Sequence, residues 1–196
     1  MFEGCFIGFG WGVFDVAVPA YATQEGVQQR VAWIFAAFGI ATVIGGLLGG
    51  LVSKKLAPLS ALRNAYVVWF ITCIPVAFTY PDWTMALVGT FIGLMGGAVQ
   101  VFYFEVLEAV RPRGSQTASL GWIWSIEGSF MAVGAAIGGV VSEQISPRVG
   151  LAMLPIMIFF GLIVLTVGRG RLSAANDIPT EEEDLRAMKD ISNEVR

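Results

Sequence analysis

Residues 45–58, GGLLGGLVSKKLAP, are almost repeated at residues 134–147 as GAAIGGVVSEQISP. Aliphatic residues mostly replace aliphatic residues, but Lys54-Lys55 become Glu143-Gln144. The offset between the copies is constant at 89 positions, close to half of the 196-residue chain, which predicts two related halves. The residues retained in both copies are Gly45, Gly49, Gly50, Ser53 and Pro58, which recur as Gly134, Gly138, Gly139, Ser142 and Pro147.

The composition is that of a membrane protein. The chain is 56% hydrophobic and 14% charged, whereas about a quarter of the residues in a soluble domain are charged. We therefore expect an all-α membrane protein, with a six-helix transmembrane bundle at residues 1–172 and a cytosolic tail at 173–196 that forms a short helix or stays frayed. The apolar blocks, each close to the length of a membrane span, are at about residues 2–22, 30–52, 63–80, 84–107, 117–141 and 149–168.

Lysine and arginine are concentrated in alternate connections between these blocks. Cytoplasmic loops of membrane proteins carry an excess of these residues. We therefore predict a multi-pass protein of the cell membrane with both termini in the cytoplasm. The cytoplasmic set is Lys54, Lys55, Arg63, Arg111, Arg113, Arg169 and Arg171, and the external set is Arg30 and Arg148.

This topology explains why the repeat keeps its glycines and loses its lysines. The first copy ends its helix in the cytoplasm, and the second copy, three helices later, ends outside, where Lys-Lys would oppose the charge bias. We therefore expect a 3+3 inverted repeat, in which the same offset matches Gly4 and Gly8 with Gly93 and Gly97. Glycines spaced by four let the backbone of a neighbouring helix approach closely.

The chain resembles the carboxy-terminal half, helices seven to twelve, of a major facilitator superfamily transporter, and is similar to its bacterial drug-efflux-like members. The resemblance covers about residues 1–172 and implies alternating access against a second six-helix bundle. That bundle would be a missing amino-terminal half, another chain, or a second copy in a homodimer. The stretches that carry the resemblance are GWGVFDVAVPAYATQEG at 10–26, FGIATVIGGLLGGLVSKKLAP at 38–58 and RPRGSQTASLGWIWSIEGSFMAVGAAIGGVVSE at 111–143.

Ionisable residues within the apolar blocks are the best candidates for transport, because each is costly to insert into a bilayer. Glu127 lies near the middle of the fifth block with no base in its own block, and Asp15 lies in the first. The alternatives without a transport role are a structural hydrogen bond for either carboxylate and ordinary packing for the aromatic residues. The predicted substrate-binding or coupling residues are Asp15, Glu127, Trp11, Gln100, Tyr103 and Trp124.

A second group of candidates lies near the cytoplasmic ends of the blocks. In the family's loop motif Lys54 sits where a base belongs, but Ser53 stands where an acid is usual. Glu105 lies near two arginines, and an ordinary interfacial ion pair is the alternative. We also expect Glu3 at the interface or in water, and Trp33, Trp69 and Trp83 near the interface or facing lipid. The predicted gating residues are Ser53, Lys54, Glu105, Arg111 and Arg113.

We predict a secondary active transporter of a small amphipathic molecule, and the resemblance implies proton-coupled export. The alternative is a membrane scaffold or assembly protein that transports nothing. An enzyme is not expected, because the chain has no histidine and no nucleophile–base pattern. For the same reason we expect no metal or other cofactor, and partners limited to a small-molecule substrate, the lipid bilayer and the second bundle, without nucleic acid.

Overall fold

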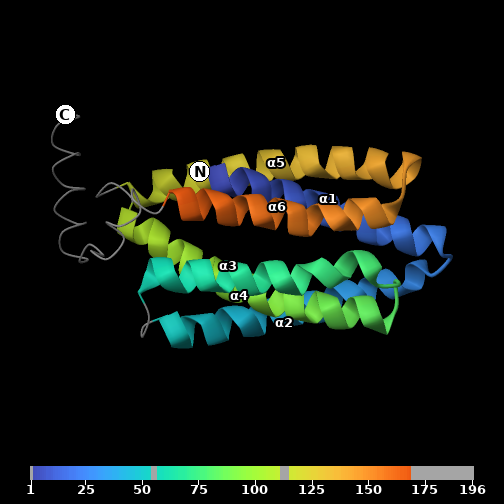
Figure 1. Ribbon diagram of the computed structural model, residues 1–196, viewed down its shortest axis with the longest axis horizontal. Coiled ribbons are helices and arrows are strands. Elements are labelled where there is room, and N and C mark those ends of the chain that lie inside the picture. The colour runs from blue at the N-terminus through green and yellow to red at the C-terminus, as the bar shows by residue number, and fades with distance from the viewer. Residues whose placement is uncertain (1, 54–56, 111–114, 169–196) are drawn as a thin grey trace.

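Figure 1 shows the computed structural model, which describes residues 2–53, 57–110 and 115–168. Six long helices run in alternate directions through these residues, and all six are long and apolar enough to cross a membrane. The six-span all-α prediction is therefore confirmed. The helices are α1 (Phe2–Gln24), α2 (Val31–Ser53), α3 (Pro58–Cys73), α4 (Trp83–Val110), α5 (Gln116–Gln144) and α6 (Pro147–Val167), with short 3-10 segments η1 (Gln28–Arg30) and η2 (Ile74–Phe78).

Helix α3 begins five residues earlier than the sequence predicts. Pro58 occupies the first turn of α3, where its missing N–H and fixed φ cost nothing. Pro147 begins α6 in the same way, after Ser146, whose side chain accepts a hydrogen bond from the Arg148 N–H. The predicted tail at 173–196, and the predicted gating residues Lys54, Arg111 and Arg113, lie outside the described residues.

The helices form two groups of three, and each group contains helices from both halves of the chain (Figure 1). Helix α1 packs most extensively on α5 and α6, and α4 packs most extensively on α2 and α3. The first helix of each half therefore lies against the second and third helices of the other half. This exchange is the packing pattern expected of a 3+3 repeat, and it supports that prediction.

Glycines allow the closest approach between α1 and α5. A Cβ atom added at Gly8 would overlap the main chain of Glu127, and one added at Gly134 would overlap the main chain of Phe9. Without a hydrophobic effect between helices in lipid, association depends on van der Waals packing, which close backbone approach increases. Each of these positions is therefore restricted to glycine by its neighbour's backbone.

The α4–α2 contact is built in the same way, but the register of the repeat differs from our prediction. A Cβ at Gly93 would overlap Phe38, and one at Gly45 would overlap Leu94. Equivalent contact residues on α2 and α5 are 89 positions apart in the sequence, as predicted. Equivalent contact residues on α1 and α4 are 85 positions apart. The prediction that Gly4 and Gly8 match Gly93 and Gly97 is wrong by one helical turn. The equivalent positions in the two halves are Gly8 and Gly93, Phe9 and Leu94, Phe38 and Glu127, and Gly45 and Gly134.

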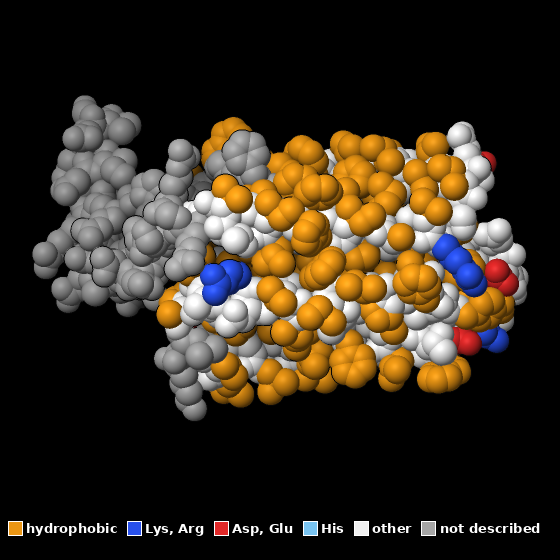
Figure 2. Space-filling view, in the orientation of Figure 1, with side chains coloured by type: hydrophobic (Ala, Val, Ile, Leu, Met, Phe, Trp, Pro, Cys, Tyr) orange, Lys and Arg blue, Asp and Glu red, His pale blue; other side chains and the backbone are white. Residues whose placement is uncertain are grey.

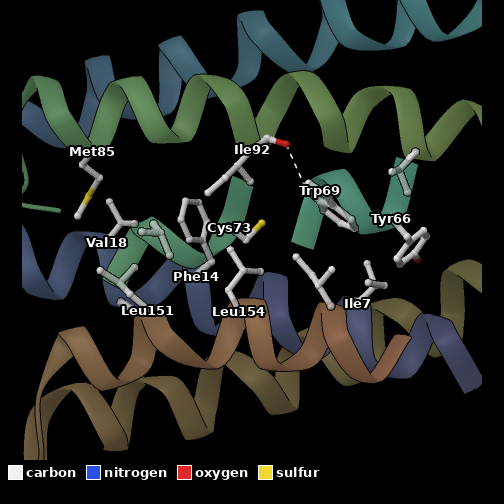
Figure 3. Close-up of a cluster of buried hydrophobic side chains, with 14 of the residues drawn as sticks. Ile7, Phe14, Val18, Tyr66, Trp69, Cys73, Met85, Ile92, Leu151 and Leu154 are labelled. Carbon is white, nitrogen blue, oxygen red and sulfur yellow. Dashed lines mark hydrogen bonds between the residues drawn. The ribbon is translucent and has the colours of Figure 1, made fainter. Parts of the chain in front are cut away.

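A core of large apolar side chains fills the space between the two groups of helices (Figure 3). Trp69, which we expected near the interface or in lipid, is instead 2% exposed in this core. Its indole N–H donates a hydrogen bond of 3.1 Å to the Ile92 carbonyl, and its ring lies against Gly96 on α4. The outer face shown in Figure 2 is mostly hydrophobic between the two ends of the bundle.

A polar network joins the halves at the end of the bundle opposite the start of α1, which we call the Arg30 end. Arg148 Nε donates a hydrogen bond of 2.7 Å to the Tyr21 hydroxyl. The Tyr21 ring meets the Tyr80 ring edge-on, and the Tyr80 hydroxyl donates a hydrogen bond of 2.9 Å to Glu25. The network therefore links α6, α1 and the connection that leads into α4.

The glycine contacts predict a sharp difference between two substitutions on α5. Gly134→Ala should lower the free energy of unfolding by about 1–3 kcal/mol, because its Cβ meets the main chain of α1. Gly128→Ala is the matched control, since no atom lies within 4 Å of a Cβ there. Unfolding of the purified protein in mixed micelles measures both changes. Equal stabilities of the two variants would contradict the close approach of α5 to α1 at Gly134.

The Tyr80 hydrogen bond predicts a pH dependence of stability. Its bond to the Glu25 carboxylate raises the pKa of Tyr80 above the ordinary 10.0. Between the ordinary pKa of Tyr80 in the unfolded chain and its raised pKa in the folded chain, the unfolded chain has lost the hydroxyl proton and the folded chain has kept it. The stability of the fold therefore falls as the pH rises through that window. Thermal unfolding from about pH 8 to pH 11 should show a smaller loss in Tyr80→Phe than in the wild type. Equal losses of stability in the two proteins would show that the Tyr80–Glu25 hydrogen bond does not contribute to the pH dependence.

Candidate functional site

A cavity of about 30 Å³ lies between the two groups of helices, in the half of the bundle where α1 begins. Four helices line it, and it contains no lysine or arginine among its described lining residues. Its volume suits one water molecule or a small ion, not an organic molecule. The polar and aromatic residues used below are Glu3 and Trp11 on α1, Trp69 on α3, Gln100 and Tyr103 on α4, and Glu127 on α5.

Glu3 is the functional candidate that sequence reasoning missed. We expected it in water or at the interface, but it is 6% exposed and lines the cavity. Its carboxylate accepts a hydrogen bond from Tyr103, so α1 and α4 are joined through the cavity wall. The available signal was Gly8 and Gly12, because glycines this close to the start of α1 predict that the beginning of the helix is packed against a neighbour.

Glu127 reaches the same cavity because α5 lies against the glycines of α1. Its main chain occupies the space where Gly8 would carry a Cβ. The Glu127 side chain is half-buried and interacts electrostatically with both Glu3 and Tyr103. Two carboxylates and a phenol thus share one small volume that holds no compensating base among the described residues.

Aromatic rings close one side of the cavity. Trp11 packs on Trp69 with ring centroids 5.7 Å apart, and on Phe38 at 5.4 Å. Trp69 is held by its hydrogen bond to α4, so neither ring can move without disturbing the core. These rings therefore lie between the carboxylates and the Arg30 end of the bundle.

The structure brings together four of the six predicted substrate or coupling residues. Trp11, Gln100, Tyr103 and Glu127 all line the cavity. Trp124 does not: it is 55% exposed, and its ring contacts Phe104. Residues three apart lie near the same face of a helix, so spacing alone does not separate Trp124 from Glu127.

Asp15 is also outside the cavity, on a face of α1 that this chain leaves exposed. It follows Trp11 by four residues, so it lies one turn nearer the Arg30 end. Among the predicted gating residues, Glu105 is half-buried on α4 and does not line the cavity. Ser53 is the last residue of α2, and its side chain lies outside the described residues.

The uncovered faces of α2 and α5 differ in character. The exposed residues of α2 are mostly large and aliphatic, as in Val43, Leu47 and Leu51, which are 64%, 68% and 71% exposed. The exposed residues in the middle of α5 include small and polar ones, Gly121, Ser125, Gly128, Ser129, Ala132 and Ala136, beside the larger Phe130, Met131 and Val133. An aliphatic face suits lipid, whereas small residues suit a packed helix or a polar space.

The family model described as Major Facilitator Superfamily matches residues 1–195. A protein of Bacillus subtilis (strain 168), named as the uncharacterized MFS-type transporter YtbD, is 28% identical over 179 residues, which are 87% of this chain and 44% of the relative. The chain thus spans less than half the length of that relative. Both similarities are to transport proteins rather than to enzymes, and no solved structure matches.

Proposed function

Because the chain belongs to the major facilitator superfamily, we propose that it forms one six-helix half of a secondary transporter for a small amphipathic molecule. The half works by alternating access, rocking against a second six-helix bundle. The match to 44% of a relative named as an MFS-type transporter supports a partner bundle of similar size. The contact pattern shared by α1 with α5 and α4 with α2 supports two inverted three-helix units.

The cavity that holds Glu3 and Glu127 is the observation that carries the proposal of proton coupling. Two carboxylates that line a space of about 30 Å³, with no lysine or arginine among its described lining residues, cannot both remain charged at low cost inside a membrane. A bound proton removes part of that charge. Coupling follows if the proton is exchanged on opposite sides of the membrane in the two states of the transporter, which drives export of the substrate.

The position of the second bundle is proposed from Asp15 and from the exposed face of α5. A carboxylate within a membrane span faces protein or a water-filled cavity and avoids lipid. Asp15 and the small polar residues of α5 therefore face the central space between the bundles, while the aliphatic face of α2 is turned towards lipid. Both termini lie in the cytoplasm of the cell, which puts the Arg30 end outside, as the loop charges favour.

Proton coupling is tested with Glu127→Gln in proteoliposomes that contain the full transporter. The variant should lose accumulation of amphipathic amines driven by a pH gradient, because a glutamine side chain cannot carry the proton. It should retain exchange of the same amines without a gradient, since the substrate path is intact. Radiolabelled or fluorescent amines report both quantities.

The control for this experiment is Asp82→Asn, which removes a carboxylate outside the cavity. Asp82 accepts hydrogen bonds from the N–H and hydroxyl of Thr84, and asparagine can accept both. Gradient-driven accumulation should be unchanged in this variant. Equal accumulation by Glu127→Gln and wild type would exclude Glu127 as the coupling residue, and the absence of any flux in wild type would favour a scaffold.

The location of the central space predicts thiol accessibility in intact membranes. In a background without Cys5 and Cys73, Asp15→Cys and Ser129→Cys should react with a water-soluble maleimide, and Leu47→Cys should not. Water reaches the first two positions in at least one state, whereas lipid surrounds the third. Labelling of Leu47→Cys alone would reverse the assignment of the two faces.

A further inference from the structure

The two acidic residues of α1 lie on either side of Trp11. Glu3, in the first turn of the helix, lines the inner cavity together with Glu127, whereas Asp15 is exposed and lies outside the cavity. At 1.5 Å per residue, Trp11 is about 12 Å along the helix from Glu3 and about 6 Å from Asp15. Trp11 and Asp15 are four residues apart, so they share one face of α1. Trp11 therefore stands between the buried carboxylates and the exposed one.

Trp11 belongs to a wall of four aromatic rings, which we call the ring wall. Its ring lies beside Phe14 of the same helix, with centroids 5.9 Å apart. It also meets Phe38 of α2 at 5.4 Å and Trp69 of α3 at 5.7 Å. An indole N–H only donates and a phenyl ring carries no polar atom, so none of these side chains can take up a proton. The Trp69 N–H is already bonded to the Ile92 carbonyl.

Beyond the ring wall, towards the Arg30 end, the core between the two groups of helices is apolar. Val18, Met85 and Leu151 fill it there, and all three are 0% exposed (Figure 3). A proton moves through a protein by way of water or titratable groups, and these side chains provide neither. The connection that remains along α1 runs past Trp11 to Asp15.

Trp11 is the member of the ring wall that faces both sides. Phe14 and Trp69 are 1% and 2% exposed, and Phe38 does not line the cavity. Of the four rings, Trp11 alone both lines the cavity and keeps part of its surface exposed. Its contacts with Phe38 and Trp69 cross from one group of helices to the other. A shift between the two groups would therefore open the wall at Trp11.

We propose that Trp11 is the barrier that prevents protons in the inner cavity from exchanging with the external side through Asp15. In the function proposed above, on which this role rests, Glu3 and Glu127 hold the coupling proton. Trp11 adds the restriction that the proton reaches the external side only when the two groups of helices have shifted. Without the indole, protons cross the membrane without any transport of substrate.

Proton leak in the absence of substrate tests this barrier. Proteoliposomes that contain the full transporter receive an external acid pulse, with trapped pyranine to report the internal pH and with potassium and valinomycin to balance charge. Trp11→Ala should acidify severalfold faster than wild type. The reason is that the space left by the indole joins the cavity of about 30 Å³ and admits water, which takes about 30 Å³ per molecule. Adding Glu3→Gln and Glu127→Gln should return the leak to the wild-type rate, because the proton loses its relay.

The controls separate a barrier from a structural role. Trp124→Ala removes the same ring from a position that is 55% exposed and outside the cavity, so these vesicles should stay as tight as wild type. Trp11→Phe and Trp11→Leu shorten the side chain in steps, and the leak should rise from Phe to Leu to Ala. In a background without Cys5 and Cys73, Trp11→Cys should leak and should be resealed by benzyl methanethiosulfonate, which restores an aromatic ring. Resealing would not occur if the leak came from a misfolded protein.

Three results would overturn the barrier: a tight membrane with folded Trp11→Ala or Trp11→Leu, a Trp11→Ala leak that persists without both carboxylates, or an equal leak in Trp124→Ala. Circular dichroism and elution as a single species show that each variant is folded. Because no substrate is present, this test is separate from the test of proton coupling. Retained gradient-driven accumulation by Glu127→Gln would refute the coupling site, whereas a tight Trp11→Ala would refute only the barrier.

Discussion

The rest of the structure depends on the close approach of two helix backbones at two places. At both places a glycine on one helix leaves room only for the main chain of the other, so a single methyl group would force the helices apart. In lipid, where apolar burial does not drive helix association, this packing is what decides which helices are neighbours. It selects partners from opposite halves of the chain, α1 with α5 and α4 with α2.

That choice of partners also builds the candidate site. Glu3 and Glu127 are 124 positions apart in the sequence and line one cavity because Gly8 accepts the main chain of Glu127. Tyr103 arrives from α4, so the cavity connects both groups of helices. A change of protonation in this cavity would therefore act on the contact between the two groups of helices. The Arg30 end, with its network around Tyr21 and Tyr80, holds the same helices together at a distance from the carboxylates.

The sequence predicts the membrane class, the six spans and the paired glycine motifs, because length, hydropathy and spacing are local properties. It also selects Glu127 and Tyr103, because a polar group within a span is costly wherever it lies. It does not predict on which side of a helix each candidate falls relative to its neighbours. For this reason the sequence groups Trp124 and Asp15 with Glu127 and assigns Trp69 to the interface. The one-turn error in matching α1 with α4 has the same origin, since several glycines at a spacing of four offer equivalent registers.

The most direct test of the exchanged pairing is disulfide cross-linking across the two halves. A Cβ at Gly89 would lie 3.9 Å from the Phe38 Cβ, within the Cβ–Cβ range of a disulfide. A Cβ at Gly139 would lie 3.7 Å from Val16 Cγ1, the position that the sulfur of a cysteine at 16 can occupy. With a protease site placed between η2 and α4, the pairs Phe38→Cys/Gly89→Cys and Val16→Cys/Gly139→Cys should each keep the cleaved halves joined on a non-reducing gel, and Phe38→Cys/Gly139→Cys should not. Separation of the halves in the first two variants, with cross-linking in the third, would contradict the account.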